Sequence, residues 1–326
     1  MAANKTGAVR HDPKVVIALT RFAISISVFN ILGYTLLGFE QPYAWPFIAL
    51  ATGYTVEIGL ELIAAASDRR APRFLGNGVR GVVEFLLPAH ITSLAVNMLL
   101  YVNDRIGVMI FGVTIAVGAK WILRTPVKGK LRHFMNPSNF GIAAVLLLYP
   151  WASIAPPYHF TENTGSAIDW LIPIVIIASG TALNAMLTNR MWLILAWVSV
   201  FALQAVVRGL IFDTSTQSAL SMMTGVAFVL FTNYMITDPG TSPSKPLHQM
   251  AFGGGVAAAY GVITALHVAY GIFFATAAVC AIRGGYHWAL HYRNLTRTRR
   301  EEQQRTLTLA PEGPSDGQEP REVVAA

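Results

Sequence analysis

The chain has little charge and almost no cysteine. Only 13% of its 326 residues are Asp, Glu, Lys or Arg, whereas 54% are hydrophobic, and this composition excludes an ordinary soluble domain. The single cysteine, Cys280, excludes an internal disulfide. The sequence also lacks a G-K-[ST] phosphate loop, a C-x-x-C pair and a recognisable nucleophile–base arrangement, and these absences argue against a hydrolase.

Long apolar stretches take the place of these motifs. A run of about 20 apolar residues is long enough to cross the hydrocarbon core of a bilayer. The sequence has ten such stretches, some of them interrupted by Gly, Pro or a polar residue. They predict an all-α integral membrane protein with about ten transmembrane helices, at 15–37, 43–66, 81–101, 105–124, 139–156, 168–188, 191–212, 218–237, 250–268 and 270–291.

The basic residues predict the orientation of these helices. If the N-terminus is cytoplasmic, the segments on that side hold 19 Lys and Arg residues, and the opposite loops hold only Arg105 and Arg208. Such an excess marks the cytoplasmic side of a membrane protein. We therefore expect a multi-pass protein of the inner (cytoplasmic) cell membrane with both termini inside. The net charge of +7 follows from this topology and does not indicate nucleic-acid binding, because the basic residues are scattered over several short loops.

The chain divides into three regions. Residues 1–14 form a polar cytoplasmic leader, residues 15–291 form one membrane domain, and residues 292–326 are predicted to be a basic and then disordered cytoplasmic tail. A faint internal similarity links HFMNPSNFGIAAVLLL (133–148) to HVAYGIFFATAAVCAI (267–282). The two copies lie five helices apart, which favours a 5+5 inverted repeat of the kind found in transporters. Chance similarity between apolar segments is the alternative.

Two short polar segments are the best candidates for a binding site. They are RHFMNPSNFGIAAVLLLYP (132–150) and TNYMITDPGTSPSK (232–245), each with a Pro-containing turn where an apolar stretch meets a cytoplasmic loop. Irregular backbone at membrane depth is tolerated only where it is buried in protein or lines a cavity. Both segments are predicted to face the same side, so one site could use both. Its candidate residues are Asn136, Pro137, Asn139, Asn233, Thr237 and Asp238.

Other residues allow a functional and a structural interpretation. Gly253 and Gly254 could bring the backbone close to a ligand, or they could simply allow two helices to pack closely. Glu57 and Glu61, four residues apart in one predicted helix, could form an ion path. The alternative for these two carboxylates is ion pairing with Arg69, Arg73 or Arg80. The i, i+4 pair His287 and His291 has no obvious third ligand, so no metal site is predicted.

The two polar segments resemble the RnfD/NqrB family, the ten-span flavoprotein subunits of the Rnf complex and of the sodium-pumping NADH:quinone oxidoreductase. The similar residues are Asn136-Pro137-Ser138-Asn139-Phe140, Thr237-Asp238-Pro239-Gly240-Thr241-Ser242 and the following Phe252-Gly253-Gly254-Gly255. The resemblance covers roughly residues 81–291. Within that superfamily the chain is most similar to the UnbU-type membrane proteins of enediyne antibiotic biosynthesis.

The resemblance implies a flavin cofactor. The family attaches FMN to a Thr in a D-x-x-[ST]-x-A-T-like motif, but the corresponding loop here reads PPYHFTENTGSAIDW, with no Thr after Ala167. Covalent FMN is therefore not expected. A noncovalent flavin, either riboflavin or FMN, is expected at the cytoplasmic Asn-rich turn, with Asn136 and Asn139 at the polar edge of the ring and Thr237 and Asp238 on the opposite wall.

These observations favour a flavin-binding, electron-transfer membrane protein, an oxidoreductase subunit that serves enediyne biosynthesis and associates with other membrane or biosynthetic redox subunits. Two alternatives stay open. The first is an ion or small-solute transporter or channel without redox activity. The second is a membrane scaffold for biosynthetic enzymes.

Overall fold

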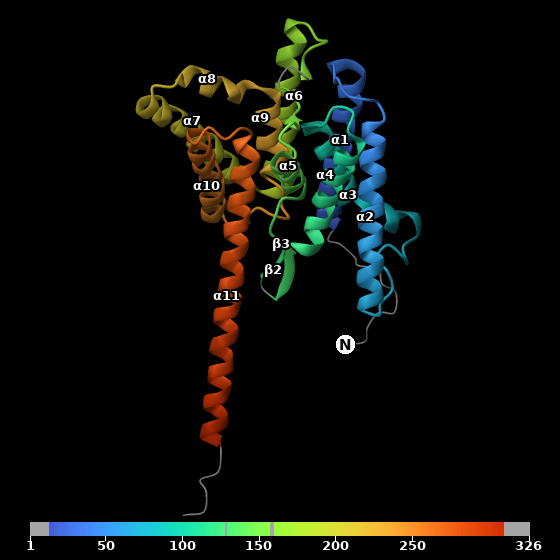
Figure 1. Cartoon of the computed structure of the whole chain (residues 1–326). Coiled ribbons are helices and arrows are strands. Elements are labelled where there is room, and N and C mark those ends of the chain that lie inside the picture. Colours follow the sequence, from blue (N-terminus) through green and yellow to red (C-terminus); the bar gives the residue numbers. More distant parts are fainter. Residues whose placement is uncertain (1–12, 128, 157–159, 310–326) are drawn as a thin grey trace, which may run out of the picture.

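The computed structural model describes residues 13–127, 129–156 and 160–309, and about three quarters of them are helical (Figure 1). The apolar stretches form helices because, without water, each backbone N–H and C=O must find a partner within the protein. The α-helices are α1 (Pro13–Leu32), α2 (Trp45–Ser67), α3 (Gly78–Leu99), α4 (Ile106–Ile122), α5 (Pro137–Leu148), α6 (Ser166–Leu183), α7 (Met191–Phe212), α8 (Thr216–Ser221), α9 (Val226–Leu230), α10 (Pro246–Ala265) and α11 (Gly271–Leu309).

Short irregular helices and strands complete the described chain. Three of them are single π-turns, η1 (Gly33–Leu37), η3 (Asn184–Thr188) and η5 (Phe231–Met235), and η4 (Met222–Thr224) is a 3-10 turn. Two antiparallel strand pairs join β1 (Leu100–Tyr101) to β4 (Ser153–Ile154) and β2 (Arg124–Val127) to β3 (Lys130–His133).

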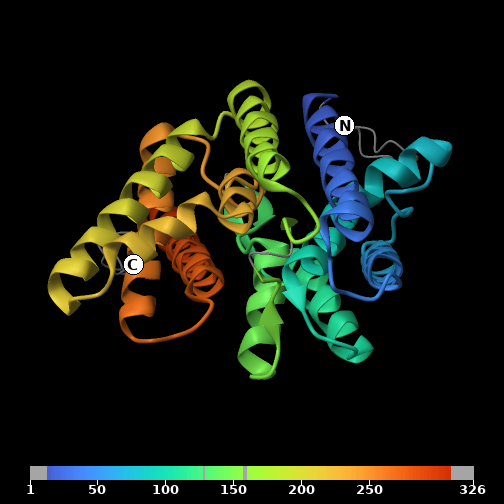
Figure 2. The same ribbon diagram turned by 90° about the horizontal axis from the view of Figure 1, so that it is seen from above.

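The helices form two groups with a central zone between them. Figure 1 shows α1 to α4 on one side, α7, α8, α10 and α11 on the other, and α5, α6 and α9 between the two groups; Figure 2 shows the same division from above. Extensive packing joins α7 to α10, α4 to α5 and α2 to α3. The β2–β3 hairpin and the far end of α11 lie on the same side of the molecule (Figure 1).

The membrane character predicted from the sequence is confirmed, whereas the number of membrane crossings stays a prediction. Each of the ten predicted segments contains helix. Five helices are long and apolar enough to span a membrane, or six if α8–η4 and α9–η5, which meet at a bend of 63°, count as one broken span. The apolar helices α4 and α5 are shorter.

The fifth predicted span differs most from its expected bounds. It was expected over 139–156, but α5 ends at Leu148, and the chain then turns into β4. Pro150 explains the early end, because a proline disfavours helical backbone in the residue before it. At about 1.5 Å per residue, the 12 residues of α5 make a helix about 18 Å long, too short to cross a bilayer alone.

The end of α11 also differs from its expected bounds. The segment expected to be a tail begins at residue 292, yet α11 continues to Leu309 (Figure 1). Between Gly285 and Pro311 the sequence has neither Gly nor Pro, and its Arg, Glu and Gln residues are good helix formers. An i, i+4 ion pair between Arg297 and Glu301 adds to the helix. Residues 310–326 and the leader residues 1–12 lie outside the described residues.

Several features occur once in each half of the chain. Both α1 and α6 end in a π-turn that is followed by a residue with positive φ, Gly38 and Asn189. Each half also contains a hydrogen-bonded pair of asparagines. In the first half, Nδ2 of Asn97 in α3 lies 2.9 Å from Oδ1 of Asn30 in α1. In the second half, Nδ2 of Asn184 in η3 lies 2.7 Å from the carbonyl oxygen of Asn233 in η5.

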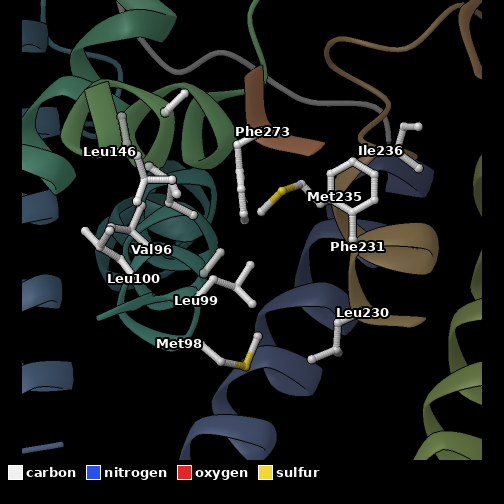
Figure 3. Close-up of a cluster of buried hydrophobic side chains, with 14 of the residues drawn as sticks. Val96, Met98, Leu99, Leu100, Leu146, Leu230, Phe231, Met235, Ile236 and Phe273 are labelled. Carbon is white, nitrogen blue, oxygen red and sulfur yellow. The ribbon is translucent and has the colours of Figure 1, made fainter. Parts of the chain in front are cut away.

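An apolar core also joins the two halves of the chain. Figure 3 shows Met98 and Leu99 of α3 on one side of the core and Leu230, Phe231 and Met235, which belong to α9 and η5, on the other. These side chains are buried. The central zone therefore brings together segments that are far apart in the sequence.

Candidate functional site

The two polar segments lie together because one asparagine joins them. Asn136 has extended backbone and caps α5, since its Oδ1 accepts the backbone N–H of Asn139 at 3.0 Å and the hydroxyl of Ser138 at 3.1 Å. Its Nδ2 donates to the carbonyl oxygen of Met235 in η5 at 2.8 Å. The amide is buried, so its hydrogen bonds fasten the start of α5 to the end of η5.

The second turn is held mainly by its own aspartate. The Oδ1 atom of Asp238 accepts the backbone N–H of Gly240 at 3.1 Å, and its Oδ2 accepts the hydroxyl of Thr241 at 2.9 Å. The carbonyl oxygen of Asp238 also accepts the Ser242 hydroxyl at 2.7 Å. Such local bonds let the chain leave η5 without a regular helix to satisfy its backbone.

A cavity of about 500 Å³ lies between the two turns and the first helices. Its long walls are apolar side chains of α1 and α3. Residues from both turns close it, and η3, α9 and η5 contribute the opposite side. The lining residues that carry the argument are Phe22, Phe29, Ala95, Met98, Tyr234 and Met235 for the walls, and Asn136, Pro137, Ser138, Asp238, Pro239 and Gly240 for the turns.

Besides Tyr234, three titratable side chains line the cavity: Lys120, His133 and Asp238. We refer to these three as the polar part of the cavity. The ammonium of Lys120 is paired with Glu57, with Nζ and Oε2 2.8 Å apart. His133 lies tightly against the second turn, since a Cβ added to Gly240 would be 2.5 Å from its Nε2. Burial lowers the pKa of His133; the charge of Asp238 raises it, and those of Lys120 and Arg124 lower it. The net direction is downward, which favours a neutral imidazole.

Three of the predicted site residues support the turns without lining the cavity. Asn139 donates from Nδ2 to the carbonyl oxygen of Phe273 at 2.9 Å and so ties α5 to α11. Thr237 donates its hydroxyl to the carbonyl oxygen of Asn233 at 2.7 Å, and Asn233 donates its Nδ2 to that of Val229 at 3.0 Å. Of the residues predicted for the two turns, Asn136, Pro137 and Asp238 face the cavity.

The two predicted glycines lie elsewhere, in the contact between α10 and α7. A Cβ added to Gly253 would be 2.5 Å from the carbonyl oxygen of Leu193, whereas one added to Gly254 would be 3.4 Å from Val200. Gly253 therefore allows two backbones to approach closely, and neither glycine lines the cavity. The structural interpretation of the glycines matches this packing.

Both candidate ion-path carboxylates are engaged in ion pairs. Glu61 is fully buried and binds Arg70, with Nη1 2.5 Å from Oε1, and Arg73, with Nε 2.7 Å from Oε2. Glu57 binds Lys120 and also accepts the indole N–H of Trp121 at 3.2 Å. Glu61 is thus a buried carboxylate held by two partly exposed arginines of the first helix group. Glu57 is connected to the cavity through its ion pair with Lys120.

Sequence reasoning missed much of the cavity. His133 directly precedes the Asn-rich turn, and Lys120 was counted only as a marker of orientation. The apolar walls from α1 and α3 give no separate signal, because any membrane helix presents such residues. Among the described residues, no group of three or more His, Cys, Asp or Glu side chains could hold a metal ion.

No protein-family model matches the sequence, and no curated protein matches it significantly. The resemblance to the RnfD/NqrB family therefore depends on the two turn motifs and the glycine-rich segment alone.

Proposed function

We propose that the protein is a membrane flavin-binding protein of the RnfD/NqrB type and that the cavity between the two turns holds a noncovalent flavin for electron transfer. The observation that carries this proposal is the cavity itself. The cavity lies beside the Asn-rich turn, where the resemblance to the family implies a flavin. Residues 136–138 and 238–240, from the two motifs that carry the resemblance, line it. Ligand sites are commonly 300–1,000 Å³ in volume, largely apolar and lined by a few convergent polar groups.

The chemistry of the lining residues suits a flat ring with one polar edge. Phe22, Phe29 and Tyr234 supply aromatic surface, and Ala95 leaves room beside them. At the polar part, His133, Lys120 and Asp238 supply both donors and acceptors for ring nitrogen and oxygen atoms. A bound flavin would supply the redox chemistry, and the protein would orient the ring and exclude water from it. Asn136 acts as a positioning residue, since its hydrogen bonds hold the two turns together.

The finer topology belongs to the same proposal. We assign ten membrane crossings related by a 5+5 inverted repeat, with both termini on the cytoplasmic side of the inner membrane. The fifth crossing would consist of the short helix α5 together with the non-helical chain that follows it. The matching π-turns and asparagine pairs support the repeat, as do the starts of α5 at Pro137 and α11 at Gly271, each four residues after a histidine. Asn139 and Phe273, which occupy the same position in the two copies, are hydrogen-bonded to each other. Sites near a repeat interface are common in this architecture.

Filling the cavity tests the proposal. Ala95→Phe places a ring where the flavin would bind, and Ala51→Phe, on the exposed surface of α2, is the matched control. We expect the wild type and Ala51→Phe to retain flavin after detergent purification, measured by absorption, and Ala95→Phe to lose it with an unchanged gel-filtration profile. A wild-type protein without flavin, or a flavin-replete Ala95→Phe, would contradict the proposal.

Two further measurements test its finer parts. Single cysteines are introduced at Thr161 and at Ser244 in a Cys280→Ser background, and intact cells are treated with an impermeant thiol reagent. We expect the cysteine at position 161 to be labelled and the one at position 244 to stay unlabelled. Labelling at Ser244 would overturn the orientation.

After denaturing electrophoresis the protein band should carry no flavin fluorescence, since the loop that precedes α6 lacks the attachment threonine. A fluorescent band would overturn the noncovalent assignment.

The setting of this activity is also part of the proposal. By its resemblance to the UnbU-type proteins, the chain would serve enediyne biosynthesis and pass electrons to or from other membrane or biosynthetic redox subunits. A solute transporter is the second candidate, because the cavity is lined by residues from both halves of the chain. Solute uptake into proteoliposomes by a flavin-free wild type would favour the transporter.

A further inference from the structure

His133 lies where the cavity meets the surface of the molecule. It is the last residue of β3, and the residues before it in that strand, 130–132, are exposed. Pro239 and Gly240, which line the cavity together with His133, are exposed as well. The cavity therefore reaches the surface beside the β2–β3 hairpin, and the imidazole stands between the surface and the apolar walls.

The ring nitrogens of His133 are free to contact a ligand. Among the described residues, neither nitrogen takes part in a hydrogen bond or an ion pair. The Nε2 edge lies against Gly240, where an added Cβ would be 2.5 Å from Nε2, so no side chain separates the imidazole from the second turn. A neutral imidazole has one donor and one acceptor nitrogen, and both are available here.

The other titratable groups of the cavity are already engaged. Lys120 is held by Glu57, with 2.8 Å between Nζ and Oε2, so the loss of its proton would leave a buried carboxylate unpaired. Both carboxylate oxygens of Asp238 accept hydrogen bonds within the second turn. The hydroxyl of Tyr234 is hydrogen-bonded to a serine of α6. His133 is therefore the cavity group best able to exchange a proton, because histidine ordinarily changes its charge between about pH 5 and pH 8.

The charges around His133 suit a ring that is neutral at rest. Burial lowers the pKa of His133, and the charges of Lys120 in α4 and Arg124 in β2 lower it further. The charges of Asp238 in the second turn and Glu57 in α2 raise it, but the net direction is downward. A negative charge that arrives on a ligand in the cavity would raise this pKa, so the imidazole would take up a proton at that moment.

We propose, on the basis of the flavin assignment above, that His133 is the proton-exchange residue of the cavity and delivers the proton that accompanies reduction of the ligand. Two electrons come from a partner redox protein, and the imidazole takes one proton from water at the surface. The N–H bond of the imidazolium then breaks as an N–H bond forms at a ring nitrogen of the ligand. His133 returns to its neutral form, and the ligand has gained two electrons and one proton. Oxidation reverses these steps.

Rapid reduction of the flavin-loaded, detergent-solubilised protein by excess dithionite tests this role, with flavin absorbance as the measure of the rate. A positioned general acid contributes about 10²–10⁴-fold. We therefore expect His133→Ala to be reduced at least about tenfold more slowly than the wild type at equal flavin content. Imidazole added to the buffer should restore most of the rate in His133→Ala and leave the wild type unchanged. His248→Ala, which removes an exposed histidine outside the cavity, is the matched control and should behave as the wild type.

Equal rates for the wild type and His133→Ala would overturn the proton role while leaving the flavin cavity in place. A slow variant that imidazole does not restore would give His133 a structural role and contradict the proposal as well. If His133→Ala does not retain flavin, His133→Gln decides, because glutamine keeps a hydrogen-bonding side chain without a titratable nitrogen; a wild-type rate in that variant would overturn the proposal. A wild type that binds no flavin would overturn the proposed function and, with it, this role.

Discussion

The contact between α7 and α10 is filled, whereas the space between α1, α3 and η5 is hollow. At the filled contact two long helices lie side by side, and Gly253 brings their backbones together over Leu193. Around the hollow, small residues such as Ala18 and Ala95 also occur, but the elements opposite them are a π-turn and the first residues of α5. Small residues thus lead to close packing only where a continuous helix lies opposite them.

The difference has a simple geometric origin. A regular helix presents a side chain about every 1.5 Å along its axis, so two such helices interlock along their whole length. The broken span bends by 63° between its parts, and α5 begins only at Pro137. Neither segment can follow α1 and α3 along their length. The polar groups freed at these breaks are satisfied by Asn136 and Asp238, and a cavity remains.

The sharpest test of this comparison is to enlarge a glycine at the filled contact. Gly253→Ala should destabilise the protein by about 3 kcal/mol, since the new Cβ would collide with the backbone of α7 and overpacked contacts cost 1–3 kcal/mol or more. Gly254→Ala, whose Cβ would make an ordinary contact, should cost less than about 1 kcal/mol. Thermal unfolding in detergent measures both. Equal stability of the two variants would show that the α7–α10 contact is not tightly closed.

The polar edge of the hollow side should be less sensitive. Glu57→Gln leaves Lys120 without its carboxylate, and breaking a buried pair costs about 3–5 kcal/mol. The cavity lets the ammonium move, so we expect a smaller loss of about 2 kcal/mol in the free energy of unfolding. The control is Glu84→Gln, which breaks the exposed i, i+4 pair with Arg80 and should cost less than about 0.5 kcal/mol. A loss for Glu57→Gln no larger than the control would contradict a buried, structural pair.

Enlarging a residue at the hollow should have almost no cost. Ala95→Val adds two methyl groups toward unfilled space, so the free energy of unfolding should change by less than about 1 kcal/mol. The same measurement on Ala257→Val, at a fully buried position of α10, should reveal a loss of about 1–3 kcal/mol. If the two valine variants lose stability equally, the cavity is not available to a side chain.

The smallest expected effect is a pH dependence at His133. Its folded-state pKa is lowered, so the folded protein favours the neutral ring more strongly than the unfolded chain does. The stability that this ring contributes is fully present above its unfolded pKa of about 6.5 and is lost as the pH falls toward the lower folded value. His133→Gln should therefore reduce the loss of stability between about pH 7 and pH 5. An unchanged pH profile in this variant would place the titration elsewhere.

The sequence predicted the helices and the starts of the two turns with good accuracy. Apolar runs predict helices in a membrane because the backbone has no other partner for its polar groups, and 191–212 was predicted with the bounds that α7 has. A polar turn was predicted at Asn136 and Pro137 with a helix from residue 139; in the structure Asn136 caps α5, which begins at Pro137. Its failures, such as the end of α5 before Pro150 and the extension of α11 to Leu309, concern local signals that an apolarity pattern does not contain.

Only the tertiary structure decided which of these residues face a common space. Asn139 and Thr237 belong to the same motifs as Asn136 and Asp238. However, Asn139 and Thr237 donate to backbone carbonyl groups, of Phe273 in α11 and of Asn233, whereas Asn136 and Asp238 line a cavity. The same holds for Gly253, which the sequence left open between ligand and helix contact. A residue's type fixes which bonds it can make. Its partner is decided by which distant segment covers it, and that depends on the packing of the whole bundle.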